Sequence, residues 1–324
     1  IDKNNGKIII SGFKSCYGLG LDASRNLFIP DFKSGYFFKI DRDLKKSEIL
    51  KLNNKKLKKI TIFDFVLFLI NYKFNNFFKG PFSKPHDVFF DRYQNMYVTQ
   101  MGSGNKRGDG YISIFSKNLK LQKIINYSKN SYGLVDPVMC YMDKKKLLYV
   151  SEYGNNKILI YKDDSCIDQI GKSNIQNNNI KNNSNLFDQV ELDRPHAIVE
   201  DEYENYYLSD TWNHRVLKFN SSGKYVGWIG KYSDGGINNN WSKEGLSKSG
   251  NELGAFNCPL DLFYYKNHIY LSDCFNNRIT KIDLTGKSLS IIDKNLFHPY
   301  GIELKNDYIY IADKENYRIK ILKI

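Results

Sequence analysis

The sequence has few cysteines, and their spacing gives them no shared role. The five cysteines are an odd number, include no Cys-x-x-Cys pair and lie in a chain of 324 residues, which is too long to depend on covalent staples. A disulfide framework is therefore not predicted. Cys16, Cys140 and Cys258 stand where short apolar strands begin, and we expect them to be small buried hydrophobic side chains.

The chain also lacks any window of 18 or more apolar residues, so no segment is long enough to cross a bilayer as a helix. No Gly-x-Ser-x-Gly elbow, Ser-His-Asp order or pair of glycosidase carboxylates can be assigned. The glycine-rich stretch 102–110 lacks the strand-then-helix context of a phosphate-binding loop. The chain starts at Ile1, already inside a repeat. Removal of an upstream signal or anchor therefore stays open, as does the compartment.

Tyrosine and phenylalanine, in contrast, are abundant, with 24 and 21 residues in a chain that is 41% apolar. Aromatic side chains favour strands, so we predict a globular protein rich in β-structure. The formal net charge is +13, and nine of these charges lie in residues 1–82. A local cationic field favours an anionic partner such as nucleic acid or a phospholipid surface. The alternative is a lysine-rich surface with no such role.

An eleven-residue block recurs along the chain. Each copy has an acid, an asparagine three positions later and a base five positions later, as in Asp210, Asn213 and Arg215. Asparagine suits a tight turn there, because its amide caps backbone groups and it tolerates a positive φ. Since a repeated unit needs the same contacts in every copy, we interpret the acid–base pairs as hairpin architecture. The copies are residues 148–158, 206–216, 269–279 and 309–319.

An opening motif, often Pro-His or Pro followed by an apolar strand, precedes each block, and a Gly-Lys turn with a further strand follows it. Four short strands per unit are typical of a propeller blade. With a weaker copy at 18–41, the count is six. We predict one all-β domain over residues 1–324, a six-bladed β-propeller. Its blades are expected at about 16–52, 84–126, 134–170, 194–230, 258–292, and 298–324 completed by 1–12.

The two ends of the chain predict how the ring closes. The chain stops after the third strand of the last blade, and residues 1–8 match the turn-and-strand sequence at 282–288. The amino-terminal strand should therefore supply the missing outer strand, with Ile8–Ile10 paired to Ile319–Leu322. Such closure leaves no open blade edge to template aggregation.

The repeated pattern is Pro-x-x-apolar, then apolar-Tyr-apolar-Ser-Asp-x-x-Asn-x-Arg-apolar, then Gly-Lys. It resembles the NHL-repeat family over essentially the whole chain. The resemblance implies a six-bladed β-propeller. It does not imply a function, because one fold carries many functions. Members of that family include RNA-binding and protein-binding propellers and one enzyme, the peptidyl-hydroxyglycine amidating lyase.

Three long inserts, 53–83, 171–193 and 231–257, are expected on one face. The reason is that each link from the fourth strand of one blade to the first strand of the next lies on the same face as the hairpins between second and third strands. Long connections are usually functional or disordered. The first insert joins a basic run to an apolar one over residues 55–78. An ordered flap is the preferred interpretation and a membrane-surface segment the alternative. We expect a packed structural loop for the third insert.

The amidating lyase has Pro-His at this inner-strand position in alternate blades, where three imidazoles hold zinc. The matching positions here carry His86, His196 and Tyr300. Catalytic zinc commonly has three protein ligands. The resemblance therefore implies His86 and His196 as metal ligands, with His298 or Asp87 as a third that lies out of register. Channel histidines that only form hydrogen bonds are the alternative.

Two tyrosines are candidates for a catalytic proton donor if the channel is an active site. Tyr300 occupies the third inner-strand position, and Tyr153 is the nearest match to the channel tyrosine of the amidating lyase. The functional arginine in the first blade of that lyase has no counterpart here.

The leading hypothesis is a non-catalytic binding propeller that recognises a protein or glycan ligand on its insert-bearing face. A metal-dependent lyase or hydrolase in the channel is the first alternative, and a propeller that binds single-stranded RNA is the second. An anionic membrane surface stays open as a partner. We expect a monomer without a cofactor, with zinc or calcium left open.

Overall fold

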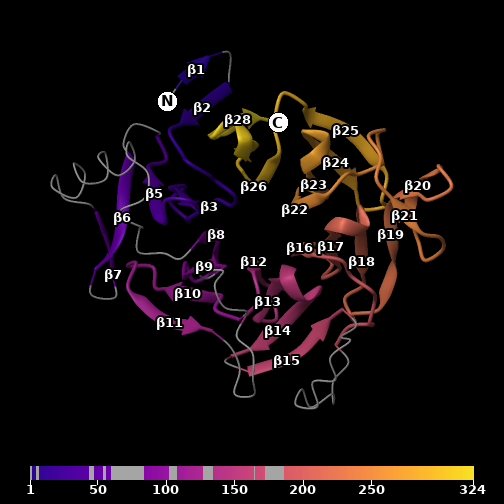
Figure 1. The fold of residues 1–324 in the computed structure, drawn as a ribbon, viewed down its shortest axis with the longest axis horizontal. Helices are drawn as coiled ribbons and strands as arrows, with labels where there is room; N and C mark the ends of the chain where they lie inside the picture. Colours follow the sequence, from indigo (N-terminus) through magenta and orange to yellow (C-terminus); the bar gives the residue numbers. More distant parts are fainter. Residues whose placement is uncertain are drawn as a thin grey trace.

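Six antiparallel sheets form a ring around a central axis in the computed structural model (Figure 1). The structure describes residues 2–4, 7–43, 47–53, 56–59, 84–101, 108–126, 134–163, 165–171 and 186–324. Each sheet extends outward from an inner strand, which confirms the predicted six-bladed β-propeller. We number the sheets blades one to six in chain order. Within these ranges, no helix is long and apolar enough to span a membrane.

The strands of each blade follow one another from the axis outward. Blade one contains β3 (Gly20–Leu21), β4 (Leu27–Asp31), β5 (Tyr36–Ile40), β6 (Ser47–Asn53) and β7 (Lys56–Lys59). Blade two contains β8 (Pro85–Phe90), β9 (Met96–Gln100), β10 (Tyr111–Phe115) and β11 (Leu121–Ile125). Blade three contains β12 (Pro137–Met142), β13 (Leu147–Glu152), β14 (Lys157–Lys162) and β15 (Ser165–Ile170).

The second half of the ring repeats this order. Blade four contains β16 (Pro195–Glu200), β17 (Tyr206–Asp210), β18 (Arg215–Phe219), β19 (Tyr225–Tyr232), β20 (Ile237–Ser242) and β21 (Ser247–Lys248). Blade five contains β22 (Pro259–Tyr265), β23 (His268–Asp273), β24 (Arg278–Asp283) and β25 (Ser288–Asp293). Blade six contains β26 (Pro299–Lys305), β27 (Tyr308–Asp313), β28 (Arg318–Lys323), β2 (Lys7–Ser11) and β1 (Asp2–Asn4).

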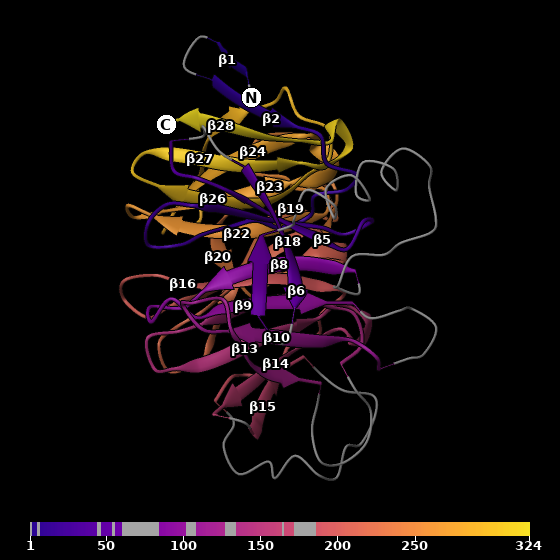
Figure 2. The same ribbon diagram turned by 90° about the vertical axis from the view of Figure 1, so that its left-hand side faces the viewer.

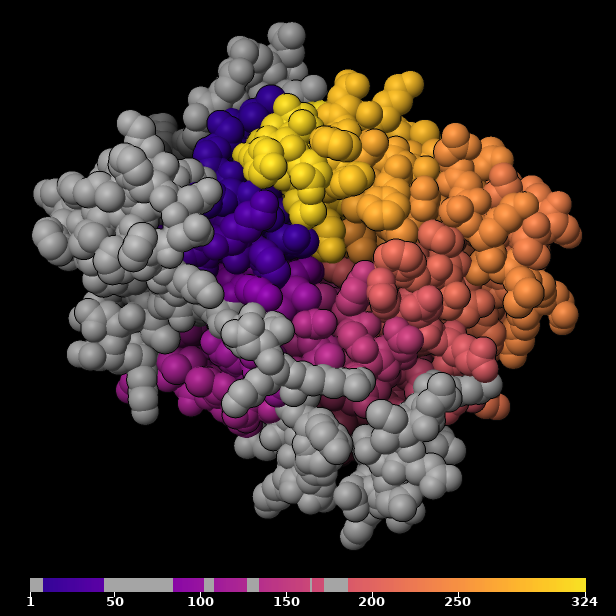
Figure 3. Space-filling view, viewed as in Figure 1, coloured from indigo at the N-terminus to yellow at the C-terminus, as the bar shows by residue number. Residues whose placement is uncertain are grey.

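The amino-terminal strand closes the ring as predicted. Strand β2 pairs antiparallel with β28, with Ile8 opposite Ile321 and Ile10 opposite Ile319. Strand β1 then adds a fifth strand to the blade. The two chain ends lie beside each other in Figure 2, and Figure 3 shows the yellow sixth blade packed against the indigo amino-terminal segment. Blade six therefore joins the first and last parts of the chain.

The apolar core is divided among the junctions between blades. Each of the six buried clusters lies at the junction of two neighbouring blades, and one of them also includes Met139 of a third blade. At the junction of blades three and four, for example, Tyr149 and Ile160 pack with Leu208 and Trp228. Because strand side chains alternate between the two faces of a sheet, every blade presents one apolar face to each neighbour. This packing holds the inner strands at fixed positions around the axis.

The acid of each repeated block ties a loop to its own blade. One oxygen of Asp273 accepts the backbone N–H of Asn257 at 2.7 Å, and the other accepts the amide of Asn276 and Nε of Arg278, each at 2.8 Å. The same arrangement recurs at Asp210 and at Asp313. The prediction that these pairs are hairpin architecture is confirmed.

A short 3-10 turn follows the acid in blades three to six: η1 (Tyr153–Asn155), η2 (Thr211–Asn213), η3 (Cys274–Asn276) and η4 (Lys314–Asn316). The amide of the repeated asparagine was expected to cap backbone groups, but it donates to the carboxylate of the acid. The positive φ also falls on a different residue. The left-handed residue is the next one in the chain, with φ between 52° and 56°. These residues are Asn156, His214, Asn277 and Tyr317.

The structure describes the third insert in full and only parts of the first two. Residues 60–83 and 172–185 lie outside the described residues, so the predicted flap at 60–78 stays a prediction. The third insert was expected to be a packed loop, but β20 and β21 pair with β19 and extend blade four. The reason is that β19 runs on to Tyr232, which gives the insert a free strand edge to pair with.

All five cysteines are unpaired thiols. Cys16, Cys140 and Cys258 are buried, as expected for small hydrophobic side chains at the start of inner strands.

Candidate functional site

The inner strands place three ring side chains against one another on the axis. His86, His196 and Tyr300 are the second residues of β8, β16 and β26, which belong to alternate blades. The centroid of the His86 ring lies 5.4 Å from that of His196 and 5.6 Å from that of Tyr300, and the His196 and Tyr300 centroids are 5.4 Å apart. The predicted approach of the two imidazoles is therefore confirmed, with Tyr300 as the third corner of a triangle.

His86 is held by its neighbouring blade. Its Nδ1 lies 2.8 Å from the carbonyl oxygen of Val138 in blade three. A carbonyl only accepts hydrogen bonds, so the neutral ring carries its proton on Nδ1 and keeps a lone pair on Nε2. Burial lowers the pKa of His86 to about 4, although the bond to Val138 acts in the opposite direction. His86 is therefore neutral at physiological pH.

His196 has no such support. Its side chain is buried, and neither Nδ1 nor Nε2 has a hydrogen-bond partner among the residues the structure describes. Burial, and then the nearby His86, lower the pKa of His196 well below its usual value. Buried polar atoms nearly always have a partner. This imidazole therefore has the capacity to bind a group on the axis that is not part of the described chain.

Tyr300 lies beneath further aromatic and basic groups at this mouth. Its ring centroid is 4.6 Å from that of Tyr17, and the Nζ of Lys314 lies 4.9 Å from the Tyr17 centroid and 5.6 Å from the Tyr300 centroid. Burial raises the pKa of Tyr300 well above its ordinary value. A tyrosine this buried gives up its proton reluctantly, which makes it a weak general acid.

The other candidates from the sequence are not part of this triangle. The His298 ring packs between Phe275 and Phe297, with centroids 5.1 Å and 4.8 Å away. Asp87 faces a cavity at the other end of the axis. Tyr153 lies at the mouth, where its Oη accepts a hydrogen bond from Nε1 of Trp212 at 2.8 Å.

We therefore tested whether the channel residues fit the zinc implied by the amidating lyase. Two neutral imidazoles, one of them with both nitrogens unpartnered, fit as ligands. Among the described residues, however, no three His, Cys, Asp or Glu side chains are grouped so that they could hold a metal ion. His86 and His196 thus supply two of the three protein ligands that catalytic zinc commonly has. This geometry supports no reaction step through a metal. The metal stays a prediction.

The rim of this mouth carries exposed aromatic side chains. The guanidinium of Arg194 lies 4.6 Å from the ring centroid of Trp212 and 5.5 Å from that of Tyr153. Further large apolar side chains on the same rim belong to blades five and six. Trp212, Phe275, Phe297 and Tyr317 are all between 43% and 48% exposed.

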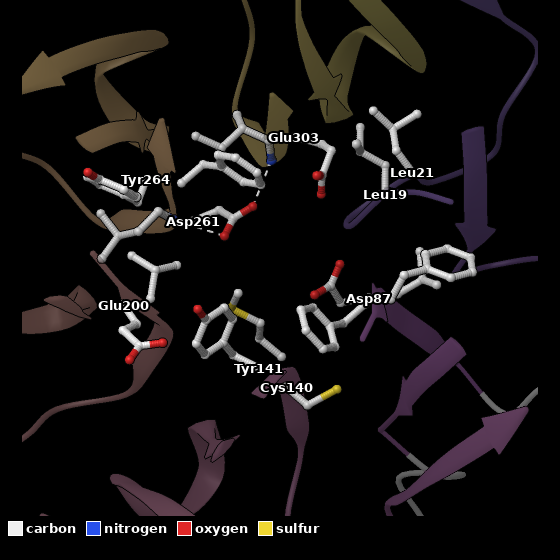
Figure 4. A pocket seen from close by; sticks show the side chains of 17 residues that line it. Leu19, Leu21, Asp87, Cys140, Tyr141, Glu200, Asp261, Tyr264 and Glu303 are labelled. Atoms are coloured by element: carbon white, nitrogen blue, oxygen red, sulfur yellow. Dashed lines mark hydrogen bonds between the residues drawn. The ribbon is translucent and has the colours of Figure 1, made fainter. Parts of the chain in front are cut away.

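A second site, which the sequence did not reveal, occupies the opposite end of the axis. A cavity of about 330 Å³ is lined there by the later residues of the inner strands. Asp87, Asp261 and Glu303 project into it from blades two, five and six (Figure 4). Blade one lies next to blade six in the clockwise direction in Figure 4 and in the anticlockwise direction in Figure 1. The two figures therefore view opposite faces. A Cβ at Gly18 would lie 1.9 Å from Asp87 Oδ1, so glycine makes room for this carboxylate.

Burial raises the pKa of all three carboxyls. That of Asp261 is raised to about 7, although its oxygens accept the backbone N–H groups of Leu262 at 2.9 Å and Ile302 at 2.7 Å. The pKa of Asp87 is raised by burial and by the charge of Asp261, and that of Glu303 by burial and by both aspartates. The carboxylates therefore interact with one another across the cavity. Asp87 and Asp261 occupy the same position in a Pro-x-Asp motif. This was the sequence signal that could have placed these two carboxylates together.

The single-stranded RNA alternative rests on exposed aromatic and basic side chains, and the concentration of positive charge in residues 1–82 counts against it. Most of the basic residues in that range have side chains outside the described part of the chain. This alternative therefore stays a prediction.

The sequence matches no family model and no curated protein. Membership of the NHL-repeat family is thus not confirmed by sequence comparison and stays a prediction. Solved structures are similar over nearly the whole chain. A catalytically inactive histidine-to-alanine variant of virginiamycin B lyase from Staphylococcus aureus, solved with quinupristin, is 13% identical, with a TM-score of 0.58. The match covers 98% of this chain and 99% of that one.

Two proteins from Bacteroides thetaiotaomicron are similar as well. An auxiliary nutrient binding protein is 14% identical, with a TM-score of 0.57, over 96% of this chain and 69% of that one. A protein of unknown function is 14% identical, with a TM-score of 0.60, over 97% and 75%. At these identities the likeness establishes the fold alone. The chain shares the six-bladed arrangement with a lyase and with a nutrient-binding protein.

Proposed function

We propose that this protein is a non-catalytic binding propeller that recognises a partner on its insert-bearing face. The observation that carries the proposal is the group of half-exposed aromatic side chains on one rim: Trp212, Phe275, Phe297 and Tyr317. Exposed apolar side chains that gather in one place mark interaction surfaces more often than scattered ones do. All four belong to hairpins or loops of blades four to six.

The stack of Arg194 on Trp212 and Tyr153 supports a protein partner in particular. Tryptophan, tyrosine and arginine are the residues most enriched at the energetic centres of protein interfaces. Here the bond from Trp212 to Tyr153 and the overlying guanidinium hold the three side chains in one arrangement before binding. Less conformational entropy is then lost on association. A glycan ligand is the other partner class to be tested.

A phage-displayed peptide library and an oligosaccharide array are the probes. We expect ligands recovered on the wild-type protein to bind the Trp212→Ala and Phe275→Ala variants about tenfold or more weakly, because removing a central aromatic contact costs about 2 kcal/mol. Tyr203→Ala is the matched control, since Tyr203 is 64% exposed on a turn at the opposite face. Ligands that lose affinity for Tyr203→Ala and keep it for the rim variants would overturn the proposal.

A metal-dependent lyase or hydrolase in the channel is the second candidate, favoured by the two unpartnered nitrogens of His196. Because the described residues offer no third ligand, we expect protein purified without chelator to contain less than stoichiometric zinc. Elemental analysis of the wild type and of His86→Ala and His196→Ala measures this. One zinc per chain, lost in both variants, would promote the enzyme over the binding propeller. Imidazole ligands contribute directly to metal affinity.

A further inference from the structure

The cavity at the end of the axis opposite the inserts is acidic, although the protein as a whole carries a net charge of +13. None of the described residues that line it is basic. The nearest cation with an effect on Glu303 is Lys305, and its Nζ donates to the carbonyl oxygen of Asp22 at 2.9 Å. Negative charge in this cavity is therefore not neutralised by a side chain that lines it.

The carboxylates also have unused capacity to accept hydrogen bonds. Each oxygen of Asp261 accepts one backbone N–H group, whereas a carboxylate oxygen can accept about two. No described residue donates a hydrogen bond to the Glu303 carboxylate. The Glu303 side chain is only partly buried, so a cation that enters the cavity can reach it.

Glu200 gives a second, independent indication of a missing partner. Its side chain reaches the same cavity from β16 (Figure 4). It is only 5% exposed. One oxygen, Oε2, accepts the backbone N–H of Lys144 at 3.0 Å, but the buried Oε1 has no partner among the described residues. Four carboxylates from four different blades thus surround one cavity.

The spacing of these groups argues for an organic cation and against a single metal ion. No three of the described acidic, histidine or cysteine side chains are grouped closely enough to hold a metal. The cavity volume of about 330 Å³ is at the lower end of the range of small-molecule pockets, about 300–1,000 Å³. Phe89, Tyr141, Phe263 and Tyr264 also line it. Aromatic rings stabilise ammonium groups and pack against methylene chains.

We propose that this cavity binds a small aliphatic di- or polyamine, with its two or three ammonium groups shared among Asp87, Asp261, Glu303 and Glu200. The ligand class follows from several separated negative charges, apolar walls between them and a volume suited to a short chain. The site lies on the face opposite the partner surface proposed above, so the failure of one proposal leaves the other standing.

Isothermal titration calorimetry of the full chain with spermidine tests the proposal at pH 8, which lies above the pKa of about 7 of Asp261. The other ionisable groups that line the cavity, Cys140, Tyr141 and Tyr264, have raised pKa values and stay neutral there. We expect one spermidine per chain, and affinity lowered about tenfold or more in Glu303→Gln. Glu303→Gln removes a charge that accepts no hydrogen bond, so the fold is retained. Glu200→Gln is a second variant, in which the amide oxygen can still accept the backbone N–H of Lys144.

Glu244→Gln is the matched control, because it makes the same change at an exposed carboxylate away from the cavity. Butylamine, with a single charge, should bind more weakly than spermidine, since it can pair with only one carboxylate. Equal spermidine affinity in the wild type and both cavity variants would overturn the proposal. So would the absence of spermidine binding, or calcium binding that depends on Glu303 while spermidine does not bind.

Discussion

Replacing Arg278 with alanine is expected to lower the free energy of unfolding by about 3–5 kcal/mol, because it strands a buried charge. The Arg278 guanidinium donates Nε to Asp273 at 2.8 Å and its other nitrogens to the carbonyl oxygens of Asn251, Glu252 and Ala255. Asp273 is fully buried, and its pKa is raised to about 6 by burial even with the arginine present. Without the arginine, Asp273 loses its one cationic partner among the described residues, and the insert carbonyls lose their donor.

The three repeated pairs form a graded series that tests this explanation. The arginine side chain is 6% exposed at Arg278, 15% at Arg215 and 25% at Arg318. Water replaces the lost partner more easily where the site is more exposed. Urea unfolding should therefore rank the alanine variants in that order, with Arg278→Ala the least stable. Arg92→Ala, at an exposed turn, is the control. Equal losses at all three positions would contradict a cost set by burial.

A second large effect is expected in the pH dependence of stability, through Asp261. Its pKa is raised to about 7 in the folded chain, so between about pH 4 and pH 7 the folded state holds a proton that the unfolded state has released. The free energy of unfolding must fall as the pH rises through this window. From pH 5 to pH 8 the wild type should lose roughly 2–3 kcal/mol that the Asp261→Asn variant does not lose.

The comparison between variants matters because other groups titrate in the same range. The pKa values of His86 and His196 are lowered by burial, so these histidines make the folded state more stable as the pH rises towards 6.5, in the case of His86 from about pH 4. The wild type and Asp261→Asn both keep these histidines. Their contribution therefore cancels when the stabilities of the two proteins are subtracted. Asp87 and Glu303 act in the same direction as Asp261, and Lys305 opposes them at Glu303. Parallel stability curves for the wild type and Asp261→Asn, from urea unfolding at each pH, would contradict the assigned cause.

The sequence predicted the features that recur in every blade. The acid–asparagine–arginine block is repeated because every hairpin needs the same ties, and that repetition also sets the register of the inner strands. Register then places His86, His196 and Tyr300 together without any knowledge of tertiary contacts. The closing pair of β2 with β28 was predictable for the same reason, since residues 1–8 repeat the outer-strand sequence of another blade.

Features that occur once were not predictable in this way. Glu303 and Glu200 have no counterparts in the repeated motif, so nothing in the sequence joined them to Asp87 and Asp261 in one cavity. The pairing of β20 and β21 with β19 depends on a strand that runs past its usual end. That His196 lacks partners depends on the arrangement of the neighbouring blades, which local sequence does not encode.

Hydrogen–deuterium exchange with and without the tightest ligand from the peptide library or the oligosaccharide array tests the central claim most directly. A partner on the insert-bearing face should slow exchange at the rim segments 211–214, 274–277, 296–298 and 314–317, and leave the turns at 91–95, 143–147, 201–205 and 306–308 unchanged. Slower exchange confined to those opposite turns, with the rim unaffected, would contradict the account.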